Sequence, residues 1–140
     1  MADLVSTERE LKDLAANLVR EWTSGTIVWL EGELGAGKTT FVRGALEGLG
    51  IVEAVRSPTF NLIQLFETDP PVMHADFYRV KQAAGTGLED YLESHLCLIE
   101  WPEHAQDLLS ELPHWCIRLD FHPKGRLVQV TPPNNYTEPS

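Results

Sequence analysis

The chain has 140 residues, a mass of 15.7 kDa and 43% hydrophobic residues, which is typical of one globular domain with a single core. Its 21 acidic residues against 11 lysines and arginines give a formal net charge of -10, which argues against a protein that binds nucleic acid through its own basic surface. A local anion site is compatible with this charge, because main-chain amides can bind phosphate without a basic patch.

The first predicted elements are a helix, a strand and a second helix. Residues 7–10 have the capping-box form Thr-x-x-Glu, and apolar side chains then recur at steps of three and four up to Trp22. The apolar run at 26–30 predicts a strand that is covered on both faces, as in a parallel sheet. A glycine-rich turn follows at 32–37, and helical spacing returns from Thr39 onward.

The middle of the chain is richer in predicted strands. Residues 61–66 and 72–77 read as a hairpin around a turn with two prolines. After a short predicted helix at 88–94, residues 96–99 form a buried strand that ends at Glu100. Pro102 is expected to start another helix.

The last predicted elements form a second hairpin, from alternating runs at 115–121 and 127–130. Residues 132–140 consist of Pro, Asn, Thr, Glu and Ser with one Tyr, so we expect a disordered tail after a single folded domain at 1–131. Neither an apolar leader nor an apolar run of about 18 residues is present, and we expect a cytoplasmic protein without a membrane segment. Cys97 and Cys116 lack zinc-site spacing, which favours reduced thiols in the core.

Residues 32–39 match the phosphate-loop motif G-x-x-x-x-G-K-[ST] in full. Its glycines let main-chain amides approach phosphate oxygens, and the following helix adds a positive dipole end. In this motif Lys38 reaches the β- and γ-phosphates, and the Thr39 hydroxyl binds Mg²⁺. With a strand before it and a helix after it, the motif predicts a site for a nucleotide and Mg²⁺. The predicted fold is α/β: a single-domain, P-loop NTPase-like three-layer sandwich with a mostly parallel central sheet and antiparallel edge hairpins.

The magnesium ion needs a second ligand, normally an acid at the end of another buried strand. Glu100 meets this requirement, although it also reads as an ordinary acid before the Pro102 helix. Asp76 is the alternative, as a residue that orients the attacking water or supports the magnesium shell, or as a solvated turn acid. His74 by itself is more typical of a buried strand histidine than of a catalyst.

Thr59, within Ser57–Phe60, is a candidate sensor of the γ-phosphate, and a simple turn before a strand is nearly as good an interpretation. Three arginines are candidates for neutralising phosphate charge, although each is more typical of a surface residue: Arg43, Arg56 and Arg79. No N-K-x-D element of a guanine-specific protein is present. ATP hydrolysis coupled to a partner is therefore favoured; a nucleotide-dependent binding module with little turnover and a small-molecule kinase are the alternatives.

Five segments occur together and in order, and their combination resembles the TsaE family, also called YjeE, over roughly residues 6–131. They are Gly35–Thr40, Ser57–Thr59, His74–Arg79, Gly87–Tyr91 and Leu98–Pro102. The resemblance implies a small ATPase of tRNA threonylcarbamoyladenosine biosynthesis, weakly active alone and more active with TsaD and TsaB. That complex modifies the adenosine beside the anticodon in tRNAs that read codons beginning with A. It also implies that tRNA is bound chiefly by the partners.

The resemblance also implies roles for particular residues. Thr39 and Glu100 would bind magnesium, and Asp76 and Thr59 would serve the γ-phosphate and the attacking water, alongside Lys38. The remaining residues implied for ATP binding are Glu8, Leu34, Gly35, Ala36, Gly37, Thr40 and Gly125.

Overall fold

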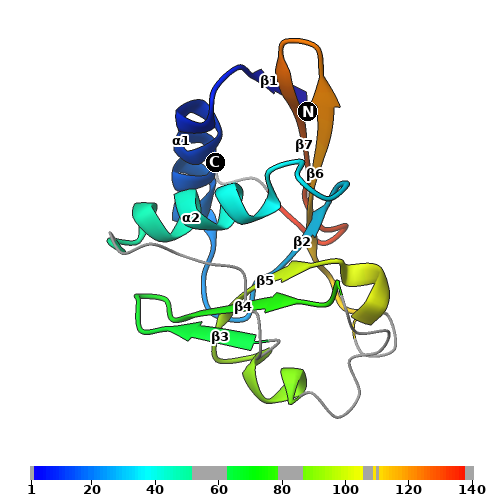
Figure 1. The fold of residues 1–140 in the computed structure, drawn as a ribbon. Helices are drawn as coiled ribbons and strands as arrows, with labels where there is room; N and C mark the ends of the chain where they lie inside the picture. Colours follow the sequence, from blue (N-terminus) through cyan, green and yellow to red (C-terminus); the bar gives the residue numbers. More distant parts are fainter. Residues whose placement is uncertain (1, 52–62, 79–86, 106–108, 110, 138–140) are drawn as a thin grey trace.

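The computed structural model describes residues 2–51, 63–78, 87–105, 109 and 111–137, and these form one mixed β-sheet with helices against it (Figure 1). The strand order is β1-β7-β6-β2-β5-β4-β3. The strands are β1 Ala2–Val5, β2 Ile27–Glu31, β3 Ile63–Phe66, β4 Val72–Asp76, β5 Leu96–Glu100, β6 Trp115–His122 and β7 Gly125–Thr131. The α-helices are α1 Glu8–Leu18 and α2 Lys38–Gly48, and the 3₁₀ helices are η1 Val19–Glu21, η2 Leu88–Tyr91 and η3 Pro102–Ala105.

The centre of the sheet is parallel and its edges are antiparallel. Strands β6, β2, β5 and β4 pair in parallel, whereas β3 pairs with β4, and β7 with both β6 and β1, in antiparallel fashion. The predicted fold class, with its parallel centre and its two edge hairpins, is therefore confirmed. Since parallel strands end at the same edge of a sheet, β2, β4 and β5 bring their carboxyl ends together.

Both faces of the central strands are covered. All five residues of β5 are buried, and alternate ones belong to different apolar clusters: Leu96 and Leu98 face one way, Cys97 and Ile99 the other. The first cluster contains the buried side chains of α1 and α2, which pack against one another over that face (Figure 1). Such burial on both sides explains why these strands read as continuous apolar runs.

Helix α1 begins at the predicted capping box. The Thr7 hydroxyl accepts a hydrogen bond from the Glu10 amide at 3.1 Å. The Glu10 carboxylate in turn accepts from the amide of Ser6 at 2.6 Å, one residue before the cap. Two amides at the helix start are thus satisfied, which fixes where the chain leaves β1 and enters α1.

Some elements differ from the sequence prediction. The sequence prediction missed strand β1, because a run of four residues with only Val5 buried shows no hydrophobic alternation. The strand forms by antiparallel pairing with β7. The helix predicted at 88–94 is the short 3₁₀ helix η2, and the start at Pro102 is the 3₁₀ helix η3. Across the described residues, no helix is both long and apolar enough to cross a membrane.

The segment after β7 returns to the core in its described part. The centroid of the Tyr136 ring lies 4.8 Å from that of the Trp115 ring in an edge-on arrangement, and the Tyr136 hydroxyl is 3.2 Å from the Glu21 carboxylate. The sequence predicted a disordered tail here from its polar composition. The one aromatic ring of the segment nevertheless provides an apolar surface that packs against Trp115. The domain boundary at residue 131 stays a prediction.

The capping contact gives a stability prediction. Thr7→Ala removes the acceptor for the Glu10 amide, and we expect it to lower the free energy of unfolding by about 1 kcal/mol. Thr7→Ser keeps the hydroxyl and is the matched control, expected to remain close to the parent chain. Urea denaturation measures both, and equal stability of the two variants would contradict the assignment of Thr7 as the cap.

Candidate nucleotide-binding site

The glycine-rich loop joins the end of β2 to the start of α2, as the sequence predicted. Gly37 is the N-cap of α2 and has a φ of 114°, a left-handed conformation that side chains other than glycine disfavour. A Cβ atom at Gly37 would also lie 2.9 Å from the Leu11 side chain of α1. Gly37 therefore allows the loop to turn into α2 while it packs closely against Leu11 of α1.

Lys38 is buried within the loop that it follows. Its ammonium donates to the carbonyl of Gly32 and to that of Glu33 at 3.3 Å, and it lies 3.9 Å from the centroid of the Trp101 ring. Burial lowers the pKa of Lys38, while the carboxylates of Glu100 and Asp76 oppose this shift. An anion bound beside the ammonium would favour its charged form further.

The two predicted acids lie side by side at the ends of β4 and β5. The parallel register pairs Asp76 with Glu100, and Leu30 of β2 with the same Glu100. From the first turn of α2, the Thr39 hydroxyl lies 3.5 Å from the Glu100 carboxylate. A hydroxyl and a carboxylate are hard oxygen donors of the kind that bind Mg²⁺ beside phosphate, so the residues present fit this ion.

Glu100 is held by a buried histidine. Its carboxylate lies 2.6 Å from Nε2 of His74, and the two side chains are 4% and 0% exposed. Nδ1 of His74 has no hydrogen-bond partner in the part of the chain that the structure describes. A proton on Nε2 of His74 fits this arrangement, because a carboxylate oxygen accepts the hydrogen bond. His74, which the sequence favoured as a structural histidine, thus orients the Glu100 carboxylate.

Asp76 has a different environment from Glu100. Burial raises the pKa of Asp76, and the negative charge of Glu100 adds to this rise. The amide of Tyr78, which donates to Asp76 at 3.0 Å, and the neighbouring His74 and Lys38 oppose it. A carboxylate with a raised pKa is a better proton acceptor than one with its ordinary pKa.

One cavity of about 210 Å³ brings most of these groups together. Trp101, which has a left-handed φ of 59°, is one of its lining residues, and the centroid of its ring lies 4.9 Å from that of the Tyr78 ring. The lining residues are Leu34, Gly35, Gly37, Lys38, Thr39, Thr40, Asp76, Tyr78, Glu100 and Trp101. The predicted lysine, threonine and both acids thus face a common space, which we call the acidic cavity.

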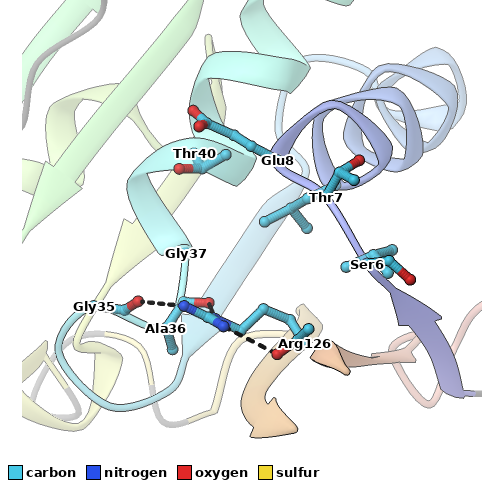
Figure 2. A pocket seen from close by; sticks show the side chains of 11 residues that line it. Ser6, Thr7, Glu8, Gly35, Ala36, Gly37, Thr40 and Arg126 are labelled. Carbon is cyan, nitrogen blue, oxygen red and sulfur yellow. Dashed lines mark hydrogen bonds between the residues drawn. The ribbon is translucent and has the colours of Figure 1, made fainter. Parts of the chain in front are cut away.

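A second cavity, also about 210 Å³, is lined by the loop, by the start of α1 and by the start of β7 (Figure 2). Glu8 comes from the start of α1, and Gly125 from the start of β7, so both outer residues implied by the resemblance lie here. The other lining residues are Val5, Ser6, Thr7, Leu11, Gly35, Ala36, Gly37, Thr40 and Arg126. We call this the helix-start cavity, and it shares Gly35, Gly37 and Thr40 with the acidic cavity.

Gly125 is at this position for a steric reason. Its φ is 143°, and a Cβ atom there would lie 2.0 Å from the Val5 carbonyl of β1. Glycine therefore lets β1 pair closely with β7 at the mouth of the helix-start cavity.

The predicted residues have different outcomes. Thr59, Arg56 and Arg79 lie outside the described residues. Arg43 lies on α2 and is not among the lining residues of either cavity. The sequence reasoning missed Arg126, whose only signal was its position directly after Gly125 in the predicted hairpin.

Known proteins with similar sequences and structures were found. A family model described as "Threonylcarbamoyl adenosine biosynthesis protein TsaE" matches residues 5–128. The tRNA threonylcarbamoyladenosine biosynthesis protein TsaE of Haemophilus influenzae is 34% identical over 130 residues, which cover 89% of this chain and 82% of that protein. The protein of the same name from Bacillus subtilis is 41% identical over 90 residues, covering 62% of this chain and 57% of that protein. The crystal structure of Bacillus subtilis YdiB superposes with a TM-score of 0.83 at 30% identity, covering 96% of this chain and 86% of that one.

The strand–loop–helix unit beside a parallel strand that ends in an acid defines an α/β protein of the P-loop class. Within that class the family match and the relatives agree. The chain belongs to the TsaE family of tRNA threonylcarbamoyladenosine biosynthesis proteins.

The buried histidine gives the second prediction. His74→Leu leaves the Glu100 carboxylate without its buried donor, and we expect a loss of about 1–3 kcal/mol in the free energy of unfolding. His74→Gln has a similar size and retains an N–H donor, so it is expected to recover part of this loss. Chemical denaturation without nucleotide or metal measures both variants, and a leucine variant as stable as the glutamine variant would contradict the role of His74.

Proposed function

We propose that the chain is a Mg²⁺-dependent ATPase that acts in tRNA threonylcarbamoyladenosine biosynthesis. The observation that carries the proposal is the convergence of Lys38, Thr39, Asp76 and Glu100 on one cavity beside the glycine-rich loop. The groups that surround this cavity indicate where the phosphate chain of ATP and Mg²⁺ would bind.

The loop supplies the phosphate contacts in this proposal. Its amides and the start of α2 favour negative charge, and Lys38 would exchange its contacts with the Gly32 and Glu33 carbonyls for phosphate oxygens. Thr39 and Glu100 would bind Mg²⁺, which neutralises charge on the phosphate chain when it is present. The two cavities meet along the loop, so one ATP molecule would span both, with its adenosine end near Glu8 and Gly125.

Asp76 would orient the attacking water. It pairs with Glu100 in the register of the sheet and accepts from the Tyr78 amide, whereas the Glu100 carboxylate lies beside the Thr39 hydroxyl. These different contacts support separate roles for the two acids. Its raised pKa favours a carboxylate that accepts a proton.

Slow turnover by the chain alone is part of the proposal. Of the described residues that line the acidic cavity, Lys38 is the only one with a positive charge. An arginine that stabilises the transition state is worth about 10³–10⁵ in rate in related phosphoryl-transfer enzymes. We infer that TsaD and TsaB complete the site or order it, and that tRNA is bound mainly by them, in agreement with the net charge of -10. The same association would place the chain in the cytoplasm.

The sparse positive charge also favours a second candidate, a nucleotide-dependent assembly module with little turnover. Phosphate release measured with and without TsaD and TsaB separates the two. Stimulation by the partners supports the ATPase, whereas tight nucleotide-dependent docking without stimulation supports the module. ADP formation that requires an added hydroxyl acceptor would instead indicate a small-molecule kinase.

The lysine gives a binding prediction. Lys38→Ala removes a charge-assisted contact worth about 1.5–3 kcal/mol, so we expect the Kd for ATP to rise by at least about tenfold. Lys12→Ala is the matched control, because Lys12 pairs with Glu47 at 3.6 Å and is not among the lining residues of either cavity. Isothermal titration calorimetry measures both, and unchanged affinity in the Lys38 variant would overturn the loop assignment.

The two acids give a prediction that separates their roles. We expect Glu100→Gln to weaken the dependence of ATP binding on Mg²⁺, because it removes a negative ligand of the ion. We expect Asp76→Asn to bind Mg²⁺ and ATP nearly normally but to hydrolyse ATP about 10²-fold more slowly. Magnesium titrations and single-turnover phosphate release measure these effects, and the opposite pattern would exchange the two assignments.

Reconstitution with the partners tests the biological part of the proposal. Threonylcarbamoyladenosine formation on tRNA by TsaD and TsaB should fall when this chain is omitted or carries Lys38→Ala, and addition of the parent chain should restore it. Full modification without the chain would contradict its assignment to this reaction.

A further inference from the structure

Arg126, at the second position of β7, makes a bridge from the β6–β7 hairpin to the glycine-rich loop (Figure 2). Nε donates to the Ala36 carbonyl at 3.1 Å, and Nη2 is within 3.4 Å of the Gly35 carbonyl. These carbonyls lie 90 and 91 positions earlier in the chain. One guanidinium group therefore holds two consecutive peptide units of the loop from outside.

The guanidinium is fixed on its own side as well. Nη1 donates to the Gly125 carbonyl at 2.9 Å, and the group lies 4.6 Å from the centroid of the Phe121 ring. The backbone of Arg126 pairs with Val5 of β1 and with Phe121 of β6. An arginine with a flat stacking surface and a backbone held between two strands has little freedom to leave the loop.

Peptide geometry converts this bridge into an effect on the amides. In a trans peptide the C=O and N–H groups point in opposite directions, so a hydrogen bond to the carbonyl also sets the direction of the amide. The amide after the Gly35 carbonyl belongs to Ala36, and it donates to the Glu33 carbonyl at 3.0 Å. That peptide is thus held on both sides. The amide after the Ala36 carbonyl is that of Gly37, the N-cap of α2.

We propose that Arg126 is a positioning residue for the phosphate loop. It orients the peptides 35–36 and 36–37 before ligand arrives, so that the Gly37 amide faces a phosphate chain and the loop does not have to order on binding. This inference rests on the proposed function, because it takes the loop to be the site of a triphosphate. Arg126 acts through the loop carbonyls rather than as a charge on the ligand.

The inference is tested with Arg126→Lys and Arg126→Met and with inorganic tripolyphosphate and ATP as ligands. Lysine keeps the positive charge but lacks the rigid planar set of donors with which the guanidinium bonds to both loop carbonyls and to Gly125. We expect both variants to bind either ligand about tenfold more weakly, the effect of losing one or two hydrogen bonds. The amide resonances of Ala36 and Gly37 should shift in both variants without ligand. Arg118→Lys is the matched control, since Arg118 lies on the same hairpin, pairs with Asp120 and is not a lining residue of either cavity.

The outcomes are distinguishable. Parent-like affinity in Arg126→Lys overturns the inference, because charge alone then suffices. Weaker binding with unshifted amide resonances also overturns the inference, since the arginine would then act on the ligand directly. Weaker binding that a fall in melting temperature explains overturns it as well, since the arginine would then act on the stability of the hairpin. Failure of the parent chain to bind tripolyphosphate or ATP refutes the proposed function. In that case the amide resonances of Ala36 and Gly37 without ligand still test whether Arg126 orders the loop.

Discussion

The parallel pairing of β5 between β2 and β4 is the constraint on which the rest of the site depends. It places Glu100 in register with Leu30, just before the glycine-rich loop, and with Asp76 at the end of β4. Three segments that are far apart in the chain therefore end at one edge of the sheet. Alternate side chains of these strands pack into two different apolar clusters, so a slip of one residue would exchange the two sets and disturb the packing of both clusters.

Burying the charges at this edge of the sheet costs desolvation free energy, and each buried charge has a polar or aromatic partner. Glu100 lies against the imidazole of His74, and Lys38 lies against loop carbonyls and the face of Trp101. Two carboxylates and one buried ammonium lie close together in the acidic cavity, beside the glycine-rich loop and the start of α2. That arrangement suits a divalent cation together with the phosphate chain it accompanies, which is consistent with membership of the TsaE family.

The loop itself is held from two directions. Helix α1 packs against Gly37, and the β6–β7 hairpin reaches the loop carbonyls through Arg126. Strand β1 connects these supports, since it pairs with β7 and leads directly into the capped start of α1. The amino-terminal strand is therefore part of the frame of the helix-start cavity, although it contributes little to the apolar core.

The sequence by itself determined the class of fold, the loop, and the pairing of Lys38 and Thr39 with an acid at the end of another strand. These features are local: a motif, apolar runs and a capping box are each readable within a few residues. Only the tertiary structure decided that His74 holds Glu100, that the loop lines two cavities, and that Arg126 bonds to Gly35 and Ala36. Those contacts join residues 26 to 91 positions apart, and they follow from strand order and register, which no local pattern encodes.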